Sequence, residues 1–259
     1  MRFARVRHVG GLVALSLALT SAASARPAPP DLAAMFASGQ YMDAAERAEV
    51  AHTADDLAFA ARSLLARCMT GDHEPDPSMV DRAAADAREA LKLDPQHEEA
   101  RLQLAIAISL KSRAMSLMDA WYAGYGGEGR KLAEEVLATD PGNYYAHGFL
   151  AVWNVEVRRR GGVLGAGLLK ASVEAGRRQY EQAARLAPDD VGIHWQFARA
   201  LTALDADRYG DEASAILDRA LAATASDHVE MVMQARAAQL AEALKENRRA
   251  AQALARQML

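Results

Sequence analysis

Three prolines at nearly constant spacing constrain the fold of this chain more than any other feature. Pro95, Pro141 and Pro188 follow one another at intervals of 46 and 47 residues, and each lies beside an aspartate in a short turn. Because proline cannot continue a helix, each one marks the end of a helical segment. A boundary that recurs in this way predicts a structural repeat, which decides the architecture of the whole chain.

The segments around these prolines agree with one another. A bulky apolar residue and an alanine lie nine and ten residues after each proline, at Leu104-Ala105, Leu150-Ala151 and Phe197-Ala198. Before each proline, two small or compact residues lie seven apart, at Ala83/Ala90, Gly129/Val136 and Gly176/Ala183. Seven residues are two helical turns, so these small residues share one face and let a neighbouring helix approach closely. The pattern predicts paired helices.

Two segments, Gly39 to Ala45 and Tyr209 to Ala213, resemble the second-helix signature of the tetratricopeptide repeat (TPR) family, and Ala90 to Pro95 resembles the end of that helix. The resemblance extends from about Asp31 to about Ala225, with middle repeats about a dozen residues longer than the 34 of that family. It implies an all-α, TPR-like helix-pair solenoid of about four to five helix pairs plus a C-terminal capping helix. An aromatic content of 6% also favours close helix packing over a sheet.

The positions of glycine and proline divide the chain into expected helices. Glycine-rich connections are expected at 124–129 and 161–167. The expected helices are a pair within 31–52, then 54–69 with 79–93, 97–122 with 128–138, 144–160 with 168–186, 191–205 with 211–223, and an unbroken closing helix over 229–258.

The N-terminus has the pattern of a secretory signal peptide. Arg2, Arg5 and Arg7 precede an apolar stretch, which ends in the small residues Ala23-Ser24-Ala25. We expect a signal peptide at 1–25, a TPR-like domain at 26–259, and export, with the bacterial periplasm as the destination. A retained membrane anchor is the alternative.

The net charge argues against nucleic acid as a partner, and the cysteine content excludes an intrachain disulfide. Loss of residues 1–25 removes three arginines and no acid, which changes the formal net charge from −4 to −7. An acidic chain is poorly suited to nucleic acid, whose binding depends on the neutralisation of phosphates. Cys68 is the single cysteine, so no intrachain disulfide can form.

Motifs of catalysis and metal binding are missing from the sequence. It contains no His-Glu-x-x-His, no paired cysteines, no phosphate loop and no Gly-x-Ser-x-Gly elbow. We therefore expect a protein that is not an enzyme and that has no cofactor and no metal.

The first helix of each pair lines the concave surface in TPR-like arrays, and the resemblance therefore implies a groove there. By the phase of the repeat, the residues that face inward include Glu99, Leu102, Ile106, Tyr145, Trp195 and Arg199. Tyrosine, tryptophan and arginine are the types that anchor interfaces. For Trp195, packing in the core is an equal alternative.

Arg158, Arg159 and Arg160 precede the second glycine-rich segment and form a possible anion site. The alternative is a solvated basic helix end that complements the helix dipole.

The leading functional hypothesis is an exported, non-catalytic scaffold or adaptor that binds a protein or peptide in its concave groove, with membrane association possible through a partner. The alternative is a periplasmic carrier or transport-associated subunit that holds a small or lipid-like ligand between its helices. A peptide binder should expose Arg199 and Tyr145, whereas a carrier should enclose mostly aliphatic side chains.

Overall fold

The computed structural model describes residues 28–71 and 74–258, and the predicted signal peptide lies outside these ranges. All regular secondary structure within them is α-helical, which confirms the predicted all-α class. The helices of the described residues are α1 (Pro30–Ala37), α2 (Tyr41–Ala51), α3 (Ala54–Thr70), α4 (Pro77–Leu93), α5 (Glu98–Arg113), α6 (Leu117–Tyr122), α7 (Tyr125–Thr139), α8 (Tyr144–Leu168), α9 (Val173–Leu186), α10 (Val191–Leu204), α11 (Ala206–Ala222), α12 (His228–Glu246) and α13 (Arg248–Gln257).

The helices pack as successive pairs, as the sequence predicts. The pairs are α1 with α2, α3 with α4, α5 with α7, α8 with α9, α10 with α11, and α12 with α13. The first helix of a pair also packs on the pair before it, as α5 does on α3 and α4. Each pair therefore buries its apolar face against its neighbours, which is how a solenoid is stabilised.

The predicted proline turns separate the middle pairs. α4, α7 and α9 each end two residues before a proline. The next helix then begins at a capping side chain. Asn143 Oδ1 accepts a hydrogen bond from the amide of Ala146 at 3.0 Å, and Asp190 Oδ1 accepts one from Ile193 at 2.8 Å. The turn residues thus end one helix and start the next.

Gly176 shows why the second helices carry small residues. A Cβ atom at this position would lie 2.9 Å from the carbonyl oxygen of Ala151 and 3.2 Å from Cγ2 of Val155. The backbone of α9 therefore approaches α8 more closely than any other residue type permits. Ala183 on the same helix is also buried, as are the equivalent residues of two other pairs, Ala83, Ala90, Gly129 and Val136.

Several predicted boundaries are wrong. α7 begins at Tyr125, inside the connection predicted at 124–129, while α9 begins at Val173 instead of 168 and α11 at Ala206 instead of 211. Residues 161–167 do not form a loop, because α8 continues to Leu168 across a kink at Gly162, which has φ +61°. The helix predicted at 97–122 ends at Arg113, and α6 follows separately. The closing helix is divided at Asn247, whose side chain caps α13 by accepting from the amide of Ala250 at 3.0 Å.

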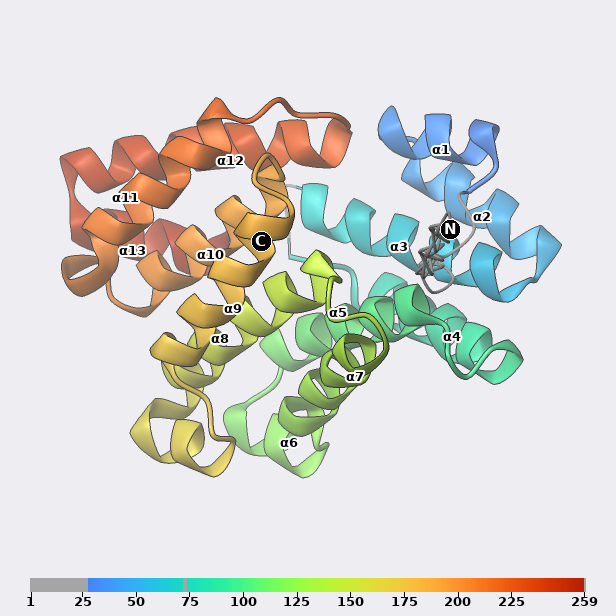
Figure 1. Ribbon diagram of the computed structural model, residues 1–259, viewed down its shortest axis with the longest axis horizontal. Helices are drawn as coiled ribbons and strands as arrows, with labels where there is room; N and C mark the ends of the chain where they lie inside the picture. The colour runs from blue at the N-terminus through green and yellow to red at the C-terminus, as the bar shows by residue number, and fades with distance from the viewer. Residues whose placement is uncertain (1–27, 72–73, 259) are drawn as a thin grey trace, which may run out of the picture.

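The two ends of the array meet. In Figure 1, the N-terminal end of α12 lies beside α1 and above α3, and α12 packs on both helices. The predicted capping helix therefore does more than cover the last repeat. It closes a curved array into a ring, with the first helices of the pairs on the inside.

Candidate binding cavity

The inner surface of the ring lines a cavity of about 1780 Å³ that is partly open to solvent. Its walls come from the first helices α3, α5, α8, α10 and α12, with contributions from α1, α6 and the start of α7. Pockets for drug-sized ligands have volumes of roughly 300–1,000 Å³. The cavity is large enough for an elongated ligand.

Polar contacts between distant parts of the chain fasten the ring. The hydroxyl of Tyr41 lies 3.0 Å from Nδ1 of His228, and Tyr41 is buried. Arg236 donates to the carbonyl oxygens of Met69 and Gly71 at the end of α3, the second at 2.7 Å. These contacts join α2 and α3 to α12, so the cavity depends on them.

Apolar side chains form most of the middle of the cavity wall. Leu102 and Ile106 of α5 face the cavity, as do Phe149 and Val152 of α8. Further apolar lining residues are Leu110, Val157, Leu169, Ile193, Val229 and Met233. Such a wall favours apolar groups through the hydrophobic effect, which does not depend on the orientation of the ligand.

Carboxylates gather where the lining helices begin. Glu98, Asp140, Asp190, Asp227 and Glu230 all line the cavity at or beside the N-terminal ends of α5, α8, α10 and α12. The helix dipole favours acids there. Burial raises the pKa of Asp190, and the nearby charges of Glu230 and Asp227 raise it further. This end of the cavity is therefore acidic.

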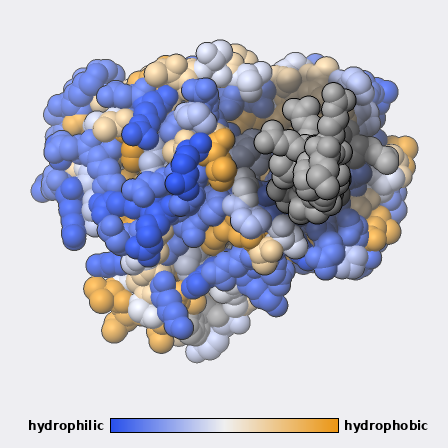
Figure 2. All heavy atoms as spheres, viewed as in Figure 1, coloured by the Kyte–Doolittle hydropathy of each residue, from blue (hydrophilic) through white to orange (hydrophobic). Residues whose placement is uncertain are grey.

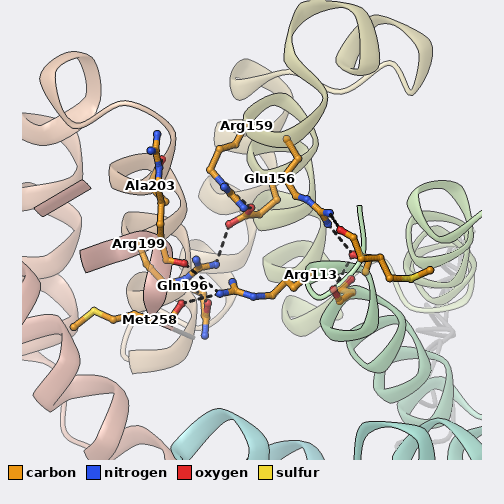
Figure 3. A network of polar contacts seen from close by, with 12 residues as sticks. Arg113, Glu156, Arg159, Gln196, Arg199, Ala203 and Met258 are labelled. Carbon is orange, nitrogen blue, oxygen red and sulfur yellow. Dashed lines mark hydrogen bonds and ion pairs between the residues drawn. The ribbon is translucent and has the colours of Figure 1, made fainter. Parts of the chain in front are cut away.

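Arginines gather at the opposite end, in the C-terminal halves of the same helices. Figure 3 shows Arg159 and Arg199 directed at Glu156, with Arg113 extending towards Met258. Glu156 Oε2 accepts from Arg159 Nε at 2.7 Å, and its Oε1 lies 3.3 Å from an Arg199 nitrogen. Burial raises the pKa of Glu156, but Arg199 and Arg159 outweigh this effect and hold it below its usual value.

Five of the six predicted groove residues line this cavity, namely Glu99, Leu102, Ile106, Tyr145 and Arg199. The expectation that Trp195 faces inward is wrong, because its side chain is fully buried in the core. Gly192, Gln196 and Arg199 form the inner stripe of α10, and Trp195 lies at its edge. A large aromatic side chain there gains most by turning into the core.

The three consecutive arginines of α8 do not form one site. Arg159 pairs with Glu156, whereas Arg160 donates to Ser112 Oγ at 3.2 Å and to the Met115 carbonyl at 3.0 Å. Arg160 lines the cavity, and Arg158 is not one of the lining residues. Successive helix residues point about 100° apart, so a run of three cannot converge on one ligand.

Sequence reasoning missed Arg113 and Glu156, which are central to the basic cluster. Both lie on the inner stripes already identified, since Arg113 follows Glu99, Leu102 and Ile106 at helical spacing. Extending the α5 stripe by two turns from Ile106, and the α8 stripe by three turns from Tyr145, would have found them.

One edge of the cavity carries an exposed apolar lip, which consists of Met118 and Tyr122 on α6 and Val163, Leu164 and Leu168 at the end of α8. Leu164 has an exposed fraction of 84%, yet it also lines the cavity, as do Met118 and Leu168. Figure 2 shows hydrophobic side chains gathered at the lower left, over the end of α8. A contiguous exposed apolar patch is typical of an interaction surface.

The described residues form no cluster suited to a metal ion and no helix suited to span a membrane. Among residues 28–71 and 74–258, no group of three or more His, Cys, Asp or Glu side chains is arranged to hold a metal ion. No helix of the described chain has both the length and the apolar content needed to cross a membrane.

Comparisons with known proteins identify the fold. No protein-family model and no curated protein sequence matches the chain. Among solved structures, it is similar to the crystal structure of a thermophilic TPR protein of Thermus thermophilus, with 20% sequence identity and a TM-score of 0.54 over 81% of this chain and 94% of that chain. The chain thus has an all-α, TPR-like helix-pair fold with lengthened middle repeats.

Proposed function

We propose that this chain is an exported, non-catalytic binding protein of the carrier type, which holds an elongated apolar or amphipathic ligand inside its ring. The observation that carries the proposal is the packing of α12 on α1 and α3, which turns a concave groove into a cavity of about 1780 Å³. The cavity is partly open to solvent, but the ring around it restricts the approach of a folded partner to the inner surface. A slender ligand is not restricted in this way.

The side chains also favour a carrier. Arg199 is 4% exposed and lines the inside of the cavity beside Glu156, so it is not presented on the outer surface as an anchor for a folded partner. The cavity wall between the two charged ends is mostly apolar. Burial of apolar surface contributes about 25 cal/mol per Å², and a long alkyl chain inside such a wall gains several kcal/mol.

The second candidate is a scaffold that receives a peptide segment of a protein partner. The 57% exposure of Tyr145 favours it, because an exposed aromatic residue beside a cavity can anchor a peptide. The TPR-like fold favours it as well.

Native mass spectrometry of the full chain tests the first candidate. The protein is purified from its own cell envelope without detergent, and the masses before and after organic extraction are compared. A carrier loses a bound species of a few hundred daltons. A protein recovered with the parent chain by crosslinking, and lost from a Tyr145→Ala/Arg199→Ala variant, would support the scaffold instead.

Export is tested separately. N-terminal sequencing of the protein from the envelope fraction is expected to begin at Arg26. An intact N-terminus would support the retained anchor.

A further inference from the structure

Among the side chains that the structure describes, the basic end of the cavity holds more positive than negative charge. Arg113, Arg159, Arg160 and Arg199 gather there around the carboxylate of Glu156. Glu74, which is exposed, also attracts Arg113. Buried charges are costly unless they are paired. Arg199 is buried and the other three arginines are half-buried, so their excess of positive charge beside the cavity favours an anion bound there.

The four arginines differ in how fully they are engaged. Arg159 donates to Glu156 at 2.7 Å, and Arg160 makes two hydrogen bonds to Ser112 and Met115. Arg113 reaches the carbonyl oxygens of Arg256 and Met258 at the long distance of 3.4 Å. A guanidinium has five N–H donors in a planar fork, so long contacts of this kind leave it able to bind an oxyanion.

Arg199 is the second arginine available to a ligand. Its Nε donates to Gln196 at 3.1 Å, and a terminal nitrogen lies 3.3 Å from Glu156. The side chain is almost fully buried and lines the cavity. Burial lowers the pKa of Arg113, Arg160 and Arg199, and the Glu156 charge only partly offsets this effect.

The basic cluster adjoins the apolar wall on the same helices. Arg113 lies two turns beyond Ile106 on α5, and Glu156 lies one turn beyond Val152 on α8. A molecule with an anionic end and a long apolar body would satisfy both regions at once. The carboxylates at the opposite end of the cavity would repel its headgroup, which fixes one orientation.

We propose that the cavity binds a single-chain amphiphile with an anionic oxyacid headgroup, held by Arg113 and Arg199, and with its alkyl chain against Leu102, Ile106 and Val152. This inference rests on the proposed carrier function and specifies its ligand class. Carboxylate and phosphate headgroups share the required chemistry, because both accept paired hydrogen bonds from arginine.

The experiment is isothermal titration calorimetry of the delipidated full chain with dodecanoate, dodecyl phosphate and dodecan-1-ol, below their aggregation concentrations. We expect at least one anion to bind ten-fold or more tightly than the alcohol, and the better one identifies the headgroup. Arg113→Met should weaken the anion ten-fold or more and leave the alcohol unchanged. Arg199→Met should act in the same direction.

Glu156→Gln provides a test with the opposite sign. It removes the carboxylate that competes with the ligand for Arg199 and should tighten anion binding several-fold. If Arg199→Met fails to fold, Arg113→Met and Glu156→Gln still test the proposal. Arg178→Met, at an exposed position on α9, is the matched control and should change nothing.

The outcomes separate this inference from the proposed function. If the alcohol binds as tightly as both anions, or if Arg113→Met and Glu156→Gln leave anion affinity unchanged, the headgroup site is wrong while the carrier function stands. If none of the three ligands binds, the carrier function itself fails.

Discussion

Arg236 offers the sharpest test of ring closure. It is half-buried on α12 and donates to the carbonyls of Met69 and Gly71 at the other end of the array. Arg236→Met keeps most of the apolar stem and removes both hydrogen bonds. A hydrogen bond from a charged donor contributes about 1.5–3 kcal/mol, and partial exposure favours the lower figure. By this figure, the two bonds together stabilise the closed ring by about 3 kcal/mol.

This energy has a measurable consequence. Because 1.4 kcal/mol is a factor of ten, about 3 kcal/mol shifts the equilibrium between closed and open rings about 100-fold. If the open form is about 0.1–1% of the parent protein, it becomes about 10–50% of the variant. Ligand affinity should fall along with the closed population, by up to about two-fold.

Distances from double electron–electron resonance can detect this change. Spin labels at Val50→Cys on α2 and Met231→Cys on α12, both exposed positions, are placed in a Cys68→Ala background. The parent should give one narrow distance distribution, and Arg236→Met should add a longer component. Arg249→Met, at an exposed position on α13, is the control. An unchanged distribution in Arg236→Met would refute the role of this contact in closing the ring.

Three further predictions concern stability and are checked by chemical denaturation. Trp195→Ala should lower the free energy of unfolding by about 3–5 kcal/mol because the Trp195 side chain is fully buried. Tyr145→Ala should change it by less than about 0.5 kcal/mol because Tyr145 is exposed. Equal effects of the two substitutions would contradict the observed placement of these side chains. Gly176→Val should lower the free energy of unfolding by about 1–3 kcal/mol, because its Cβ would lie 2.9 Å from a backbone oxygen of α8. Unchanged stability would show that α8 and α9 can move apart freely. Burial and the neighbouring Glu49 raise the pKa of Asp86 to about 7. Between about pH 4 and pH 7, Asp86 is therefore protonated in the folded state and ionised in the unfolded state. The free energy of unfolding should decline as pH rises through this range. Asp86→Asn should therefore raise the free energy of unfolding by about 1–2 kcal/mol at about pH 8, after allowance for solvent screening, and should make it less dependent on pH. A variant less stable than the parent at that pH would refute the assignment.

The helix pairs could be predicted because their signals are local. Pro95 and Pro141 mark helix ends through their own covalent structure, and Gly176 and Ala183 mark contact faces through their size. These signals do not depend on distant parts of the chain. The kink at Gly162 was missed because a glycine-rich segment is also compatible with a loop.

Ring closure could not be predicted in the same way. The curvature of a solenoid accumulates from small rotations between repeats, and no single residue encodes it. Tyr41 and His228 lie 187 residues apart in the sequence, and no sequence motif predicts that they are in contact. The inner stripe was predicted well on α5, while Trp195 shows that phase alone cannot tell the edge of a stripe from the core.

The central claim is that the ring binds a ligand inside its cavity, and a neutral apolar fluorophore tests it most directly. The full chain is titrated with N-phenyl-1-naphthylamine, whose emission increases in an apolar site. Ile106→Trp fills the cavity wall, and Val50→Trp adds the same side chain to an exposed position on α2 as the control. We predict saturable binding to the parent and to Val50→Trp, with at least a ten-fold loss in Ile106→Trp. Binding that is absent from the parent, or equal in all three proteins, would contradict the claim.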